Sequence, residues 1–275
     1  HISNTIYTSF EVKNSSNDFL KGCHIIIWTT TPWTIPANRA LAYSSKIKYS
    51  VIQIGKDTEH FQNKNIIIAS KLVKKVSEDC NFQDFKVLKE FTGNEFKNTI
   101  CQHPFLNLGY NYDVPMLDGD FVILDQGTGI VHTAPRHGPD DFNLCLKHGI
   151  KAPDTMNDAG IYTNEIPFFS GMHIFKADSA IIDKLSECKS LLGNGKLQHS
   201  FPHSWRSKAP LVYRATPQWF ISMEKNNLRK KALKAIDDTV FYPARGKERI
   251  RSMIETRPDW CISRQRVWGV PLPIF

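Results

Sequence analysis

The sequence of 275 residues lacks closely spaced cysteines. Its six cysteines are spread along the chain, and the nearest two, Cys80 and Cys101, lie 21 positions apart. No Cys-x-x-Cys pair is therefore present for zinc or redox chemistry. Dispersed cysteines of this kind fit reduced thiols with structural roles, and we expect a cytoplasmic protein.

Long apolar runs are also missing. The most apolar local run covers only residues 24–28, whereas a bilayer span needs roughly 18 to 20 residues. No basic and then apolar leader opens the chain, and the 15 Gly and 15 Pro follow no period. These absences exclude a membrane span, a collagen-like chain and a repeat architecture.

Common nucleotide and hydrolase motifs are absent as well. The sequence has no Walker loop, no Gly-x-Gly-x-x-Gly turn and no Gly-x-Ser-x-Gly elbow, which excludes the usual phosphate cradles and serine hydrolases. What is present is a 41% apolar content, enough for a large core, and a net charge of +8, which favours a polyanionic partner. Because the chain starts at His1 and ends in an apolar run at Phe275, we expect a piece of a longer protein.

The apolar patterns predict an α+β fold. Apolar residues at three-four spacing predict helices over 69–78 and 178–188. Runs of β-branched and aromatic residues predict strands at 23–28, 47–54, 66–69 and 120–125. Strands outnumber helices and do not alternate strictly with them, which favours a strongly bent sheet or a β-barrel-like domain with peripheral helices over a doubly wound parallel sheet.

The glycines at 193 and 195 predict a domain edge within 191–196. We therefore expect one domain over residues 1–198 and a connecting segment over 199–275. Residues 205–275 hold four of the six Trp among nine Arg. That mixture suits a phosphate-bearing partner or an interface between domains, and the sequence leaves both open.

A hydroxyl-rich turn is predicted at Thr29, Thr30 and Thr31, which follow an apolar strand and precede two prolines. Proline cannot continue a strand ladder, so hydroxyls and freed backbone N–H groups converge there. The turn could hold a water, a ribose or a carbonyl oxygen, but it offers no strong base. Alternatively, the hydroxyls only satisfy the backbone of their own loop.

A second cluster spans residues 127–142. A Gly-rich turn leads to a short strand with His132, and a helix is predicted from Pro139 to about His148. One of Asp140 and Asp141 could complement the helix N-terminus while the other pairs with a substrate ammonium. His132 has no neighbour in the sequence that would tune its pKa, so we expect it to be a core residue or a pocket wall instead of a catalyst. A divalent metal site from these His and Asp residues is a further alternative, but its spacing matches no helix-borne metalloprotease pattern.

Residues 28–38 and 127–141 together resemble the editing domain inserted in isoleucyl-tRNA synthetase. Residues 214–220 and 257–271 resemble the segments where that chain returns to its catalytic domain. The resemblance implies hydrolysis of valine wrongly esterified to the isoleucine tRNA, with the tRNA 3′ end and the rest of the synthetase as partners and a monomeric state. It implies no cofactor for this piece, ATP and Mg²⁺ being expected only for the full-length enzyme.

The same resemblance implies roles for single residues. Asp141 would hold the substrate α-ammonium, and His132 would line the side-chain pocket and exclude isoleucine. Thr29, Thr30 and Thr31, with Trp33 and Asn38, would position the terminal adenosine and the ester.

Two departures from the family stand out. No His-Ile-Gly-His or Lys-Met-Ser-Lys-Ser signature is present, so we expect no amino-acid activation by this chain. Arg136 occupies a position associated with glycine. A catalytically silent tRNA-docking module, supported by the basic residues 205–275, is the alternative function.

Overall fold

The computed structural model describes residues 1–56, 58, 60–265 and 269–272. The chain divides into two compact units, His1–Arg214 and Ala215–Phe275. No helix in the described part of the chain is long and apolar enough to cross a membrane.

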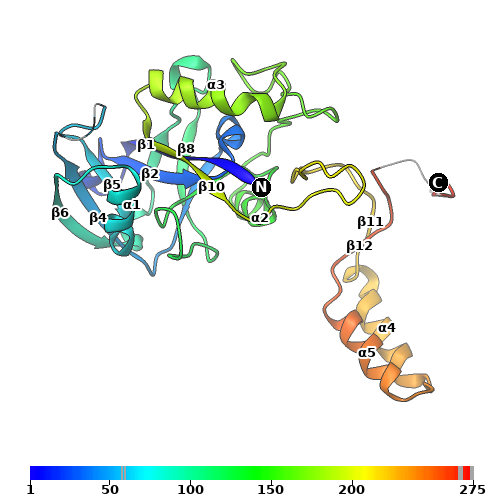
Figure 1. The fold of residues 1–275 in the computed structure, drawn as a ribbon. Helices are drawn as coiled ribbons and strands as arrows, with labels where there is room; N and C mark the ends of the chain where they lie inside the picture. The colour runs from blue at the N-terminus through cyan, green and yellow to red at the C-terminus, as the bar shows by residue number, and fades with distance from the viewer. Residues whose placement is uncertain (57, 59, 266–268, 273–275) are drawn as a thin grey trace. The chain divides into compact units, whose positions relative to one another are not determined.

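The first unit is built on a mixed sheet of ten strands (Figure 1). The strands are β1 (Ile2–Asn14), β2 (His24–Thr29), β3 (Ala40–Tyr43), β4 (Lys48–Ile54), β5 (Asn65–Ala69), β6 (Phe85–Thr92), β7 (Ile100–Gln102), β8 (Asp113–Asp118), β9 (Val131–Thr133) and β10 (Leu191–Gln198). Their order is β6-β4-β5-β2-β1-β7-β8-β3-β9, with β10 paired to β1. This path is open, so the described strands form no closed barrel, but the predicted α+β class is confirmed.

The helices of this unit lie between and around the strands. The α-helices are α1 (Val73–Asp79), α2 (Pro139–Lys147) and α3 (Ile174–Glu187). The 3-10 helices are η1 (Asp18–Leu20), η2 (Pro32–Ala37), η3 (Ser70–Leu72), η4 (Gly93–Phe96) and η5 (Leu106–Leu108). α3 packs against η2, β1 and β10, and it buries Ile174, Ala177, Ile181 and Leu185 along one face. It therefore supports the turn that follows β2.

Four of the five predicted strands are confirmed, as β2, β4, β5 and the short strand of His132, β9. Ile25, Ile26 and Ile27 are fully buried, as expected of a strand covered on both faces. The strand predicted at 120–125 is wrong. β8 ends at Asp118, whose carboxylate accepts the Ser45 N–H (2.9 Å), and the chain then turns from Gly119.

The predicted helices are confirmed with shifted ends. The first begins as η3 and continues as α1 to Asp79, and α2 begins at Pro139 as expected. α3 begins four residues before the predicted start. The cause is His173, whose side chain accepts the Phe175 N–H at the helix N-terminus.

The structure has no domain edge within 191–196, where the sequence predicted one, because these residues lie in β10. β10 pairs antiparallel with Ile2–Thr8 of β1. A Cβ at Gly193 would lie 3.0 Å from Cys80 Sγ, and one at Gly195 would lie 3.2 Å from Thr5 Oγ1. The glycines thus permit close packing instead of a turn. The structure divides the chain after Arg214, whereas the sequence placed the boundary after residue 198.

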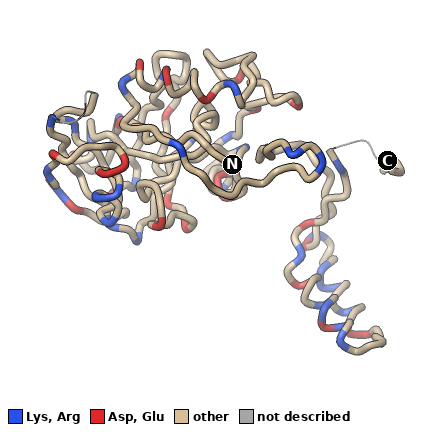
Figure 2. The backbone as a smooth tube through the Cα atoms, viewed as in Figure 1, with Lys and Arg blue, Asp and Glu red and all other residues tan. Residues whose placement is uncertain are grey.

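The second unit contains a helical hairpin and a two-stranded sheet. Its elements are β11 (Phe220–Ile221), η6 (Lys225–Asn227), α4 (Leu228–Asp238), α5 (Arg245–Glu255) and β12 (Trp260–Cys261). Figure 2 shows Lys and Arg along both α4 and α5. Arg229 donates to the carbonyls of Ile254 (2.5 Å) and Arg257 (2.8 Å), so at least one of these cations holds the hairpin together. Residues 266–268 of the last family-like segment lie outside the described residues.

Candidate functional site

The hydroxyl-rich turn forms as predicted, immediately after β2. Pro32 begins η2, so the strand ladder ends at Thr29 and the chain coils into a 3-10 helix. Thr29 Oγ1 lies 3.1 Å from Thr31 Oγ1, and Thr31 Oγ1 lies 3.3 Å from Thr34 Oγ1. The hydroxyl of Thr30, half-buried, stands outside this chain of contacts. Three threonine hydroxyls are therefore linked in a row.

Thr34 was not among the predicted site residues, and the structure places it at the centre of this network. It is buried, and its hydroxyl contacts both Thr31 and His132. The signal was present in the sequence, because residues three apart lie on one face of a 3-10 helix that starts at Pro32.

His132 is held by two hydrogen bonds whose directions fix its protons. The Asn38 amide donates to the Ala40 carbonyl (2.9 Å), which orients the amide so that its other N–H donates to His132 Nδ1 (2.7 Å). The Thr34 hydroxyl donates to the Thr31 carbonyl (2.8 Å), so His132 Nε2 donates to that hydroxyl (3.0 Å). The imidazole is therefore neutral, and both of its nitrogens are occupied.

The electrostatics of His132 agree with this assignment. The side chain is buried, and this burial, together with the neighbouring His137, lowers the pKa of His132 to about 3. A ring that is neutral and bonded at both nitrogens has no free lone pair with which to accept a proton from water. His132 is therefore a rigid, neutral ring.

Two polar atoms of residues next to His132 have no hydrogen-bond partner within the described protein. One is Asn38 Oδ1, on the amide that bonds the ring, and the other is Thr133 Oγ1, from the residue after His132 in β9, where successive side chains lie on opposite faces. Both residues are fully buried. A buried acceptor or hydroxyl without a partner is costly, by about 1–3 kcal/mol each. Such atoms are suited to receive a hydrogen bond from a bound molecule or a water.

Asp141 lies in the first turn of α2, close in the chain to His132. Its Oδ2 accepts the Ala134 N–H at 2.8 Å. Burial raises the pKa of Asp141 to about 6; the Ala134 bond opposes this shift, and the charge of Asp140 adds to it. Asp140 itself is exposed. Of the two carboxylates, Asp141 is the one whose charge is poorly solvated and available to a cationic partner.

This raised pKa predicts a measurable effect on stability. The folded protein retains the Asp141 proton between pH 3.8 and about 6, where the unfolded chain has lost it, so this group lowers stability as the pH rises through that range. Asp141→Asn keeps an acceptor for Ala134 but carries no charge. We expect the variant to melt at a higher temperature than the wild type at pH 7.5, with a free energy of unfolding that is larger by about 1 kcal/mol.

Thermal melts of both proteins across pH 4 to 8 check this expectation. The difference should vanish near pH 4, where Asp141 is protonated in the wild type too. A variant that is less stable than the wild type at pH 7.5 would show that the carboxylate charge is compensated inside the protein.

Trp33 is fixed at its backbone. Its N–H donates to Asp178 Oδ1 of α3 (3.0 Å), and its carbonyl accepts the Tyr162 hydroxyl. Its ring meets the His137 ring edge to face, with the centroids 4.9 Å apart. Asp178 and Tyr162 were not predicted as site residues, because they lie more than 100 positions away in the sequence and carry no local motif.

Metal ligands were the alternative for this cluster. No group of three or more His, Cys, Asp or Glu that could hold a metal occurs among residues 1–56, 58, 60–265 and 269–272. His137 is also bonded at both nitrogens, to the Tyr213 carbonyl (2.9 Å) and to Thr155 Oγ1 (2.8 Å). The absence of a metal requirement stays a prediction.

The structure therefore brings most of the predicted residues into one region. Thr29, Thr31, His132 and Asn38 are connected through Thr34. Asp141 is attached two residues beyond His132, through Ala134. The result is a neutral imidazole, a half-buried carboxylate and a row of hydroxyls with no strong base among them.

The sequence matches the family described as tRNA synthetases class I (I, L, M and V) over residues 2–275. The chain belongs to this family.

Individual relatives agree with the resemblance to the isoleucine enzyme. The chain is 63% identical over its whole length to the isoleucine–tRNA ligase of Pelagibacter ubique, and 44% identical over 99% of its length to that of Gluconobacter oxydans. It spans about 30% of the length of these relatives. These relatives confirm the resemblance to isoleucyl-tRNA synthetase that the motifs indicated.

The fold has a counterpart among solved structures. The crystal structure of GlLeuRS-CP1 matches with a TM-score of 0.52, covering 72% of this chain and all of that one, at 14% identity. At this identity the match concerns the fold alone. The class I synthetase chain thus shares its fold with a CP1 domain.

Proposed function

We propose that this chain is the editing region of an isoleucyl-tRNA synthetase and hydrolyses the ester that links valine to the isoleucine tRNA. The observation that carries the proposal is the state of His132, a buried, neutral ring bonded at both nitrogens. Such a ring, with the half-buried Asp141 carboxylate nearby in the chain, can limit the size of an aliphatic side chain without taking part in the chemistry.

Editing is needed because an apolar pocket discriminates poorly against a smaller side chain. A synthetic pocket made for isoleucine binds isoleucine only about 1–3 kcal/mol more favourably than valine, which is smaller by one methylene. A second site that admits valine and excludes isoleucine supplies the missing discrimination. His132 is the residue proposed to set that size limit.

The proposed reaction needs positioned water more than it needs a base. Water attacks the ester carbonyl, the bond from that carbon to the ribose oxygen breaks, and the proton passes to the ribose oxygen, giving free valine and uncharged tRNA. An aminoacyl ester is already activated, and the vicinal ribose hydroxyl lies next to the leaving oxygen. The threonine hydroxyls and the unpartnered Asn38 Oδ1 are suited to orient the water and the ester.

Asp141 is proposed to hold the valine ammonium. Its burial disfavours the charge in the empty site, and an ammonium would restore a favourable partner. Trp33, held by Asp178 and Tyr162, is proposed to stack on the terminal adenosine.

The second unit supports a tRNA partner. Residues 215–275 contain twelve Lys and Arg against six Asp and Glu, so most of the positive excess of the chain lies there. The remaining partners we propose are the rest of the synthetase chain, in a monomeric and cytoplasmic enzyme.

Release of valine from Val-tRNA by the 275-residue chain tests the proposal against the alternative of a silent docking module. We expect deacylation well above the spontaneous rate. Tight tRNA binding with no acceleration would favour the docking module.

Metal dependence provides an independent prediction. We propose that no cofactor takes part in this hydrolysis, so prolonged EDTA treatment of the protein, followed by assay with tRNA kept folded by spermidine, should leave the rate unchanged. Activity that disappears and returns with zinc or manganese would replace the proposed mechanism with a metallohydrolase.

A further inference from the structure

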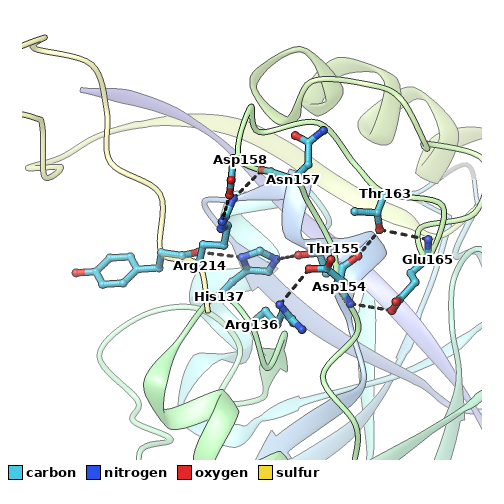
Figure 3. Close-up of polar contacts among 10 residues, drawn as sticks. Arg136, His137, Asp154, Thr155, Asn157, Asp158, Thr163, Glu165 and Arg214 are labelled. Atoms are coloured by element: carbon cyan, nitrogen blue, oxygen red, sulfur yellow. Dashed lines mark hydrogen bonds and ion pairs between the residues drawn. The ribbon is translucent and has the colours of Figure 1, made fainter. Parts of the chain in front are cut away.

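A cluster of polar contacts joins the loop after β9 to the end of the first unit (Figure 3). His137 of this loop touches three segments that are distant in sequence. It contacts Trp33 of η2, Thr155 of the irregular segment after α2, and Tyr213 near the end of the unit. The proposed mechanism makes no use of His137 or of these last two segments.

The hydrogen bonds of His137 fix the orientation of its ring. The Tyr213 carbonyl can only accept, so His137 Nδ1 carries the proton and donates to it (2.9 Å). His137 Nε2 then accepts the Thr155 hydroxyl proton (2.8 Å). Rotation of the ring would break both bonds. The ring also meets Trp33 at an interplanar angle of 80°, so its fixed edge limits where the indole can lie.

Arg214 holds the Tyr213 carbonyl in place. Its guanidinium donates to the Asn157 carbonyl (2.7 Å) and pairs with Asp158. Arg136, at the position associated with glycine, pairs with Asp154 at 3.0 Å. Its φ is not positive, so the loop needs no glycine there. Segment 154–158 is thus tied both to the loop that carries His137 and to the end of the unit.

We propose that Arg214 and His137 are positioning residues for the editing site. Arg214 holds residues 213–214 against segment 154–158, and His137, bonded to the Tyr213 carbonyl, in turn fixes the position of the Trp33 ring. This inference rests on the proposed function, in which Trp33 contacts the terminal nucleoside. Ala215 begins the second unit. The last residues of the first unit therefore contact the site through the hydrogen bond between the Tyr213 carbonyl and His137.

The expected effect is on substrate binding more than on the chemical step. A loosened Trp33 holds the nucleoside less well, but it leaves Asp141 and the threonine hydroxyls in place. Asp158 is 96% exposed, so its ion pair with Arg214 is weak alone, and the backbone bond to Asn157 adds to it. We expect Arg214→Ala and His137→Ala to raise KM for Val-tRNA about three- to tenfold with kcat nearly unchanged.

The test uses the full-length ligase and steady-state deacylation of Val-tRNA. Arg214→Lys, which retains the charge toward Asp158, should recover part of the lost KM. Lys13→Ala is the matched control, because it also removes an exposed ion pair, with Asp113. Lys13 lies away from the site, seven residues along β1 from Ile6, the residue that pairs with Thr29. It should behave as the wild type.

A double-mutant cycle decides whether Arg214 acts through Trp33. In a Trp33→Ala background, Arg214→Ala should have no further effect on KM. Three results would overturn the positioning role while leaving the editing function standing. They are full additivity of the effects of Trp33→Ala and Arg214→Ala on KM, a loss confined to kcat, and Arg214→Ala and His137→Ala variants that behave like Lys13→Ala. A wild-type ligase that does not deacylate Val-tRNA would overturn the proposed function, and this inference with it.

Discussion

Replacing His132 by alanine is expected to widen the specificity of the hydrolysis instead of abolishing it. Removal of the ring opens space beside Asn38 and Thr34, which now bond to it, and hydrolysis of correctly charged Ile-tRNA should appear. Hydrolysis of Val-tRNA should stay within about tenfold of the wild type. A general base would behave differently, because its loss depresses the rate roughly 100-fold or more and creates no new activity.

Both rates must be measured on one preparation of the variant. The substitution removes the partners of two buried polar groups, so circular dichroism melts are needed to show that the protein is folded. A folded His132→Ala protein that loses Val-tRNA hydrolysis and gains nothing on Ile-tRNA would contradict the size-limiting role.

Asp141→Asn is expected to have the largest effect on activity. The amide can still accept the Ala134 N–H, so the local backbone is retained and only the negative charge is lost. If that charge binds the valine ammonium, kcat/KM for Val-tRNA should fall on the order of 100-fold or more, as for truncation of a buried charge pair.

The matched control lies next to it in the sequence. Asp140 is exposed and makes no capping hydrogen bond at the start of α2, so Asp140→Asn should change kcat/KM less than about twofold and stability by less than about 1 kcal/mol. A loss confined to Asp140→Asn would reverse the roles of the two carboxylates.

Local patterns were enough to predict the three α-helices of the first unit and four of its ten strands. These elements, including α2 with Pro139 at its start, follow from apolar spacing and from proline chemistry. The failures have causes that lie far away in the sequence. The glycines of β10 are in close contact with Cys80 and Thr5, more than 100 positions away, and in the sequence alone they resemble a domain edge.

The candidate site shows the same division. The threonine turn and the pair at Asp140 and Asp141 are visible as motifs, whereas only the fold shows which of the two carboxylates is the less exposed. The protons of His132 depend on Thr34 and Asn38, which are 98 and 94 positions away. No periodicity reports a contact of that kind, since it is created by the pairing of β3 with β9.

The most direct test of the account compares two esters on the same tRNA. Wild-type chain and full-length ligase are each given Val-tRNA(Ile) and Ile-tRNA(Ile), and the release of amino acid is followed over time. The account predicts rapid release of valine and little release of isoleucine, because the His132 ring excludes the extra methylene. Equal release of the two amino acids, or release of neither by either protein, would contradict it.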